Sequence, residues 1–252
     1  MRALIALLAL AGCHEDLLAD LPDAAAPPAD ACVPAGSHIV YLNREPTTFT
    51  PGSPDDSVAN VTSLVSAEVT TQGVSTLQLT DTRWRTITEC VAALLAAYDV
   101  RVTNEDPGDV DHWELVVTHD GTEVGQPASS AGVAPAGCPS AGPREIAFAF
   151  WQPFNLGMDA QGMCELLGWE IGIMAGLSPT VDCRDVLGPL DGSAPECADP
   201  ATFLDETVGC ADAADYQPAD CRCGGTLQNS DLTLTAYFGV NACAGAGSGS
   251  GP

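Results

Sequence analysis

Residues 159–179 read DAQGMCELLGWEIGIMAGLSP, and this stretch constrains the arrangement of the other elements. Between residues 162 and 177 only Glu165 and Glu170 are charged, so a helix here is apolar on nearly every side. The helix is expected to begin after Asp159, which is a good N-cap, and to end at the Gly-Leu-Ser-Pro sequence that closes the stretch. A helix of this kind must be buried, so the other elements have to cover it.

Strand and helix signals elsewhere indicate what covers this helix. Apolar residues at spacings of three and four predict a second helix over residues 82–98, with N-caps offered at residues 80–82. A polar loop is expected from the first strand to about residue 60, and a Gly/Pro/Ser loop over residues 121–143. This order predicts an α+β fold with long buried helices on a mixed twisted sheet. Strands are predicted at residues 37–43, 99–103, 113–119 and 145–151.

The buried helix resembles the zinc-binding motif of the metzincin (zincin) metalloproteases, His-Glu-x-x-His-x-x-Gly-x-x-His. At that spacing Glu170 and Gly176 fall on the Glu and the Gly. The three His positions fall on Trp169, Ile173 and Pro179, none of which has a side-chain ligand for zinc. The resemblance therefore implies a zincin-like fold with a dismantled active site, and we expect neither a metal nor another cofactor.

The resemblance extends beyond the helix. Residues 182–187 resemble the segment that leads to the Met-turn of this family, with Leu187 where Met would stand. The Cys-Arg-Cys-Gly-Gly sequence at residues 221–225 is similar to that of a group of secreted, metalloprotease-like bacterial lipoproteins. On this resemblance the metzincin-like domain covers residues 37–190, and a Cys-rich extension covers residues 191–243.

Glu170 would be a vestigial general base, because without a metal-bound water it has nothing to deprotonate. We expect its carboxylate to be satisfied by a backbone donor or by an Arg, with Arg144 and Arg184 as the candidates. Trp169 and Ile173, one helical turn apart, are expected to fill the vacated metal site. The four His residues are distant in sequence and are expected to lie on the surface or in hydrogen bonds: His14, His38, His112 and His119.

Charge excludes several functions. The 252 residues carry 34 acidic and 8 basic side chains, a net charge of −26, and all the basic residues are Arg. The absence of Lys excludes a Walker phosphate loop and a Schiff-base enzyme, and the absence of a basic face excludes nucleic-acid binding. The acids of residues 185–220 show no calcium-loop register, so we expect them to be solvated.

The N-terminus predicts export and a lipid anchor. The apolar run of residues 3–11 is too short to cross a bilayer of about 30 Å. It ends in Leu-Ala-Gly-Cys, which resembles the lipobox of bacterial lipoproteins. The resemblance implies a signal peptide at residues 1–12, a lipidated Cys13 and, because His14 follows, the outer membrane or cell surface. An ordinary signal peptide with a coincidental Cys is the alternative.

Composition marks the flanking segments and the disulfides. Residues 13–36 are rich in Ala, Pro and acids and predict a tether, and residues 244–252 predict a flexible Gly/Ser tail. The ten Cys residues other than Cys13 are expected to form up to five disulfides, although Cys221 and Cys223 could instead be a metal or redox pair. The ten are Cys32, Cys90, Cys138, Cys164, Cys183, Cys197, Cys210, Cys221, Cys223 and Cys243.

These features predict a surface-anchored lipoprotein that binds a peptide or protein without catalysis, along a sheet edge. Two alternatives remain: a hydrolase with an unrecognised site or a metallopeptidase that holds zinc through carboxylates, and a structural envelope protein. A cleft beside a free sheet edge would favour binding. Ionisable groups clustered in that cleft would favour an enzyme, and the absence of a cleft would favour a structural role.

The lipid anchor is testable by detergent phase partitioning of the wild type and of Cys13→Ser. The wild type is expected in the detergent phase, beginning at Cys13, because a lipoprotein N-terminus supplies the two or more acyl chains needed for stable attachment. The variant is expected in the aqueous phase. An aqueous wild type that still begins at residue 1 would contradict the prediction.

Overall fold

The computed structural model describes residues 36–74, 79–140, 142–152, 160–189 and 200–242. These residues belong to one compact unit, Val33–Pro252. Among them, no helix is long and apolar enough to span a membrane. The predicted signal peptide, nearly all of the tether, the tail and the N-cap Asp159 lie outside the described residues, as do Cys13, His14, Cys32, Cys197 and Cys243.

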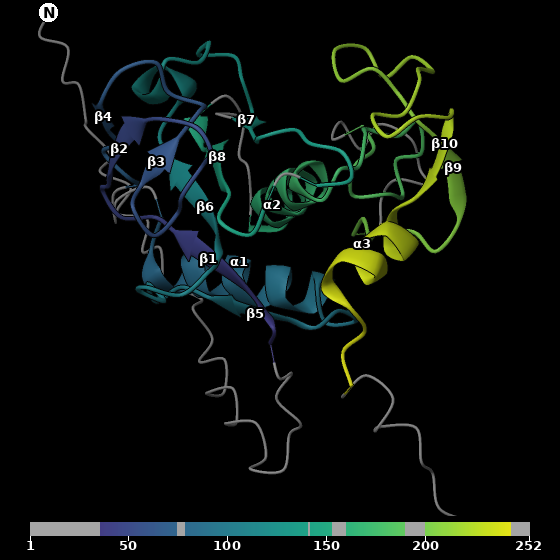
Figure 1. Cartoon of the computed structure of the whole chain (residues 1–252), viewed down its shortest axis with the longest axis horizontal. Coiled ribbons are helices and arrows are strands. Elements are labelled where there is room, and N and C mark those ends of the chain that lie inside the picture. The colour runs from purple at the N-terminus through teal and green to yellow at the C-terminus, as the bar shows by residue number, and fades with distance from the viewer. Residues whose placement is uncertain (1–35, 75–78, 141, 153–159, 190–199, 243–252) are drawn as a thin grey trace, which may run out of the picture. The chain divides into compact units, whose positions relative to one another are not determined.

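A five-stranded sheet is the central element (Figure 1). In chain order its strands are β1 (His38–Asn43), β5 (Val100–Thr103), β6 (Trp113–Thr118), β7 (Gly132–Val133) and β8 (Ile146–Phe150). The spatial order is β5-β1-β6-β8-β7, with the first four strands parallel and β7 antiparallel at the edge. The four predicted strands are confirmed to within a residue at each end, and β7 was missed.

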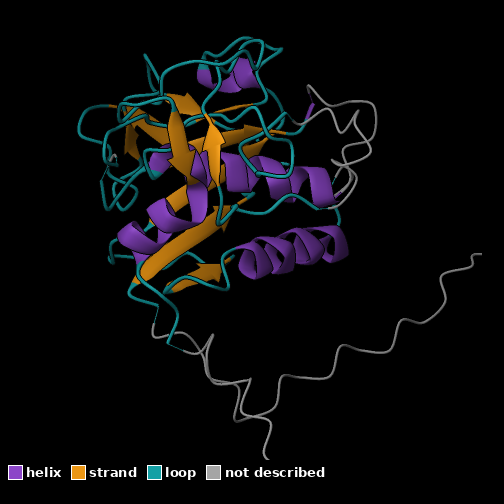
Figure 2. Cartoon of the chain, turned by 90° about the vertical axis from the view of Figure 1, so that its right-hand side faces the viewer, coloured by secondary structure: helices purple, strands orange, loops and turns teal. Residues whose placement is uncertain are grey.

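One face of this sheet carries two helices, α1 (Asp81–Leu94) and α2 (Ala160–Met174), which pack side by side (Figure 2). Leu115 and Ala147 point to this face and join the main hydrophobic core. Their neighbours Val116 and Phe148 point to the opposite face and join a second core. Every residue of β6 and β8 is buried, as expected for parallel strands that are covered on both faces. The mixed α+β architecture predicted from the sequence is therefore confirmed.

The second face is covered by a segment whose first part, to about residue 60, the sequence predicts to be a polar loop, and for whose remainder it predicts no element. Three short strands, β2 (Thr48–Pro51), β3 (Val61–Thr62) and β4 (Val69–Thr70), form a sheet of order β3-β2-β4, and a 3-10 helix η1 (Gly121–Val124) lies nearby. Phe49 anchors the small sheet, with its ring centroid 5.2 Å from that of Phe148. The loop prediction is wrong because strands of two to four residues carry too few positions to show an alternating pattern.

Two boundaries also differ from prediction. Thr80 caps α1, since its side chain accepts a hydrogen bond from the Arg83 amide, but α1 ends at Leu94 rather than near residue 98. Tyr98 is instead part of a short β-bridge with Val240, and its hydroxyl donates to Asp231 at 2.7 Å. The apolar periodicity continued to Tyr98 because this residue is buried in the same core as α1, although it lies beyond the end of the helix.

The segment of residues 200–242 contains β9 (Thr207–Gly209), β10 (Leu227–Asn229) and α3 (Ser230–Phe238). Phe203, Leu234 and Phe238 lie in the main core with the sheet and α2. Phe238 also contacts Trp113 of β6, with ring centroids 5.1 Å apart. Apolar packing, in addition to disulfides, therefore holds this segment against the rest of the fold.

Three disulfides join described residues: Cys90–Cys164, Cys138–Cys223 and Cys210–Cys221. Cys183 is also disulfide-bonded. The disulfide prediction is confirmed for these residues, and the alternative in which Cys221 and Cys223 form a metal or redox pair is wrong, because each bonds to a different cysteine.

Loop length predicts how much each disulfide stabilises. Cys90–Cys164 joins residues 74 positions apart in sequence, and Cys210–Cys221 joins residues 11 positions apart. Loop-closure entropy makes the first bridge more stabilising by about 1.5–2 kcal/mol. Urea unfolding of the two double Cys→Ala variants should show this order in the free energy of unfolding. A larger loss for the short bridge would contradict the entropic account.

Candidate functional site

Glycines let other elements approach α2 closely. A Cβ on Gly168 would lie 2.5 Å from the Leu94 side chain of α1, and a Cβ on Gly172 would lie 2.8 Å from the Leu187 side chain. Each glycine is less favourable than Ala in a helix by about 1 kcal/mol, but it makes these close contacts possible. The segment that resembles the approach to a Met-turn therefore lies against α2, with Leu187 fully buried.

Glu170 is buried in α2 without a hydrogen-bond partner. Its exposed fraction is 1%, and neither carboxyl oxygen has a hydrogen-bond partner among the described residues. The edge strand β7 passes so close that a Cβ on Gly132 would overlap Oε1 of Glu170. Burial raises the pKa of Glu170 well above its usual range. Burial without a donor therefore favours the neutral form of this carboxyl.

The expected partners of Glu170 are engaged elsewhere. Arg144 pairs with Asp111 and Asp56, and Arg184 pairs with Asp182 and with Glu206. The prediction that an Arg or a backbone donor satisfies Glu170 is therefore wrong. A carboxylate would require such a donor in this interior, whereas a neutral carboxyl has a much smaller desolvation cost.

The positions where the resembled motif has His lie in apolar surroundings. Ile173 is buried and Trp169 is half-buried, and both pack with the main core. The Trp169 Nε1 atom is buried without a partner. Pro179 is buried just beyond the end of α2, where its carbonyl accepts a hydrogen bond from the Ala211 amide. Trp169 and Ile173 thus contribute apolar volume on the helix that carries Glu170.

The end of α2 is closed by a residue that sequence reasoning did not select. Gly176 has φ of +90°, and a Cβ there would collide with the Pro139 carbonyl, so glycine is required at this turn. The Arg222 guanidinium donates to the carbonyls of Ile173 (3.2 Å) and Leu177 (3.0 Å). It satisfies acceptors that a helix C-terminus leaves open. Arg222 lies between two cysteines, and the Cys spacing alone gave no sign of this role.

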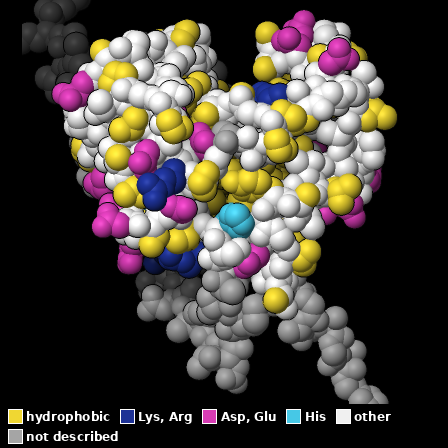
Figure 3. All heavy atoms as spheres, in the orientation of Figure 1, with side chains coloured by type: hydrophobic (Ala, Val, Ile, Leu, Met, Phe, Trp, Pro, Cys, Tyr) yellow, Lys and Arg dark blue, Asp and Glu magenta, His cyan; other side chains and the backbone are white. Residues whose placement is uncertain are grey.

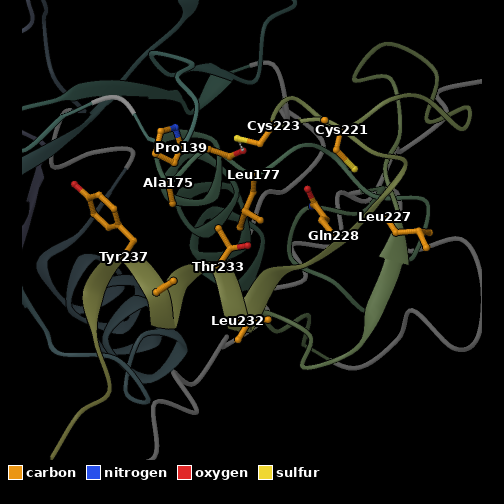
Figure 4. A pocket seen from close by; sticks show the side chains of 13 residues that line it. Pro139, Ala175, Leu177, Cys221, Cys223, Leu227, Gln228, Leu232, Thr233 and Tyr237 are labelled. Atoms are coloured by element: carbon orange, nitrogen blue, oxygen red, sulfur yellow. Dashed lines mark hydrogen bonds between the residues drawn. The ribbon is translucent and has the colours of Figure 1, made fainter.

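A groove of about 500 Å³ opens at this end of α2 (Figure 3). The helix end and Pro139 form one side, and α3 forms the other, with Thr233 and Tyr237 facing Ala175 (Figure 4). The Cys138–Cys223 disulfide fixes the segment after β7 to the segment before β10. Tyr237 is the only ionisable side chain among the lining residues, since the lining cysteines are in disulfides.

Leu227 and Leu232, at the rim of the groove, are 61% and 64% exposed. Exposed Leu side chains beside an apolar groove are typical of a binding surface. Gln228, also in the lining, fixes the local backbone, because it accepts from the Ser178 amide (2.9 Å) and donates to the Ser178 carbonyl (2.7 Å).

The remaining candidate groups lie in separate places. Asp185 is buried, where it accepts from Ser230 Oγ (2.6 Å) and the Leu187 amide (2.9 Å), so the expectation that it is solvated is wrong. His112 is buried with Nδ1 2.8 Å from the Val110 carbonyl oxygen, and His119 is half-buried beside Asp120. His38 packs against the Tyr237 ring. In the described part of the chain, no three His, Cys, Asp or Glu residues form a group that could hold a metal.

Comparison with known proteins identified no relative of this chain. No protein-family model, curated protein or solved structure matches the chain. The class of the protein therefore has to be argued from its own residues.

Burial of Glu170 predicts a pH dependence of stability. The folded chain binds this proton more tightly than the unfolded chain, so the free energy of unfolding should fall as pH rises above about 4.5, by up to about 1.4 kcal/mol per pH unit. Burial also raises the pKa of Glu114 and of Glu145 to about 7, which adds to the same slope.

Urea unfolding of Glu170→Gln between pH values of about 4.5 and 8 isolates the contribution of Glu170. The slope should become shallower, so that the variant gains stability over the wild type as pH rises. Glu89→Gln, which removes the same charge from an exposed site on α1, should leave the slope unchanged. An equal effect of the two variants would mean that net charge, rather than burial, causes the slope.

Proposed function

We propose that this chain is a lipid-anchored, catalytically inactive relative of the metzincin metalloproteases that binds extended, uncharged peptide segments at the cell envelope. The observation that carries the proposal is the apolar groove at the end of α2, the helix on which Glu170 has no hydrogen-bond partner among the described residues. The lipid anchor and the envelope location rest on the Leu-Ala-Gly-Cys sequence that ends at Cys13.

The metzincin relationship is supported by the combination of motif and surroundings. Glu170 and Gly176 keep the spacing of the motif, and the helix ends at Gly176 in a turn that only glycine readily adopts. Leu187, in the place of the family's Met, packs against Gly172 beneath this helix. A mixed sheet with one antiparallel edge strand lies beside the same helix.

The edge strand β7 supports peptide binding. It pairs with β8 on one side only, and Phe150 N–H donates to the Ala131 carbonyl at 2.8 Å. Because backbone groups alternate in antiparallel pairs, those of Gly132 and Ala134 point toward the unpaired side. An extended peptide can pair with these groups as an added strand. The small residues of this segment leave room for it.

The groove supports the uncharged character of the ligand. A charged side chain in it would meet no counter-charge, because its lining residues carry none. The net charge of −26 also disfavours acidic ligands. With Tyr237 as the only ionisable group of the lining, the groove favours binding over the hydrolase alternative, and its presence favours binding over a purely structural role.

Binding is testable by fluorescence anisotropy with the purified full-length chain and a labelled library of capped, uncharged peptides. Peptides with one large apolar side chain are expected to bind. Leu227→Ser with Leu232→Ser should weaken binding at least tenfold, because burying one Leu contributes about 1.5–3 kcal/mol. Val240→Ser, which changes an equally exposed apolar residue outside the groove, is the matched control. Equal losses in both variants, or no bound peptide, would overturn the proposal.

Catalytic inactivity is testable by elemental analysis of dialysed protein together with a chelator-sensitive peptidase assay. We expect neither stoichiometric zinc nor cleavage, because Trp169, Ile173 and Pro179 cannot donate to zinc. One zinc per chain, or an activity abolished by Glu170→Gln, would favour the enzyme alternative. Replacing the three residues together by His is the converse test, and zinc binding by this variant would support the metzincin relationship.

A further inference from the structure

A second cavity, of about 350 Å³, lies away from the groove and has a mainly polar lining. Tyr41 and Asn43 of β1 and Glu114 of β6 form its inner wall. The loops that contain residues 57–60 and 106–109 form the rest. Its volume falls within the roughly 300–1,000 Å³ of small-molecule sites. None of its lining residues belongs to the groove proposed to bind peptides.

Glu114 is the deepest charged group of this cavity. Only 2% of its surface is exposed, and Oε1 accepts a hydrogen bond from the Asn43 side chain at 2.7 Å. Among the described residues nothing donates to Oε2, although this atom is not enclosed by protein. One carboxyl oxygen in the cavity wall is thus free to accept a hydrogen bond from a ligand.

The cavity is electrostatically negative. Burial, together with the charges of Glu114, Asp106 and Glu45, raises the pKa of Tyr41 to about 12. Burial, and then the charge of Asp106, raises the pKa of Glu114 to about 7 against the opposing hydrogen bond from Asn43. Burial is the larger cause of both pKa shifts, and the acidic side chains around the cavity add to it; a bound cation would offset their charge.

The protein supplies no cation of its own to this field. No Arg is present among the lining residues, and the chain has no Lys. The nearest Arg in sequence, Arg44, pairs with Asp81 at 2.5 Å and with Glu45 at 3.5 Å. The Arg44 guanidinium partly offsets the negative charge of Glu45, whereas no described residue forms an ion pair with Glu114.

We propose that this cavity binds an organic cation, a guanidinium or primary ammonium group, through the free oxygen of Glu114. Such a group donates charge-assisted hydrogen bonds to the carboxylate, and the aromatic ring of Tyr41 in the wall favours a cation further. A bare metal ion fits less well, because the described residues hold no group of three His, Cys, Asp or Glu in ligand positions.

The test is calorimetric titration of the full-length chain at pH 8 with butylguanidinium and with butylurea, which has nearly the same shape but no charge. Butylguanidinium is expected to bind one to one, and butylurea is expected not to bind. Glu114→Gln should weaken the binding about tenfold or more, as expected for a lost hydrogen bond to a charged group. Glu89→Gln, on the surface of α1, is the control for net charge and should have little effect.

The pH dependence gives an independent readout. Butylguanidinium binding should weaken about tenfold from pH 8 to pH 6, because Glu114 becomes protonated around pH 7. His112, which also lines the cavity, acts in the same direction, since a protonated imidazole repels a cation. Asp106, Asp109 and Glu45 are the other charged groups of the wall.

Four outcomes would overturn the proposal. Equal binding of butylurea would show that charge is not recognised, and an equal loss in Glu89→Gln would show that only net charge matters. Displacement of butylguanidinium by submillimolar calcium would assign the cavity to a metal. Circular dichroism of Glu114→Gln establishes that the variant is folded, and binding unchanged in a folded variant would also contradict the assignment.

Discussion

The fold depends on one constraint: α2 is apolar nearly all round, so it must be covered on every side. The sheet covers one side, with β7 against Glu170, and α1 covers another through the contact between Leu94 and Gly168. The turn that carries Leu187 covers a third side at Gly172. The Cys-rich segment closes the end of the helix through Arg222. Glycines in the helix and in β7 make these approaches close enough to exclude water.

In the proposed function, this enclosure favours binding over catalysis. Trp169 and Ile173 contribute apolar volume beside Glu170, and burial without a donor favours the neutral form of its carboxyl. An unpaired buried polar group costs stability, by about 1–3 kcal/mol. At the end of the helix, Pro139 and α3 border an apolar groove, which can bury apolar side chains of a ligand. Backbone pairing is available separately, at the edge strand β7.

The sequence predicted the elements whose residues repeat with a clear period. The four parallel strands, α1 and α2 are long enough to show one. The strand β7 could not be predicted, because its two residues show no pattern and its role comes from the approach to Glu170. The lone Phe49 likewise gave no sign of the small sheet that it anchors.

The same limit applies to the sites. Glu170 could be selected from the motif spacing, but its lack of a partner depends on where Arg144 and Arg184 lie in the fold. Arg222 contacts the helix end at Ile173, 49 positions away in sequence, and Asn43 contacts Glu114, 71 positions away. No local pattern reports contacts of that kind. The groove and the polar cavity are therefore properties of the fold that sequence reasoning did not reach.

The most direct test of the account is the protonation state of Glu170, read by difference infrared spectroscopy between the wild type and Glu170→Gln at neutral pH. An enclosed, unpaired Glu170 should give the carbonyl stretching band of a neutral, non-hydrogen-bonded carboxyl in the wild type, and the variant should lack this band. The band should persist when zinc is added. A carboxylate band in its place, or a band that zinc abolishes, would show that Glu170 is paired or reaches a metal, and would contradict the enclosed, inactive site.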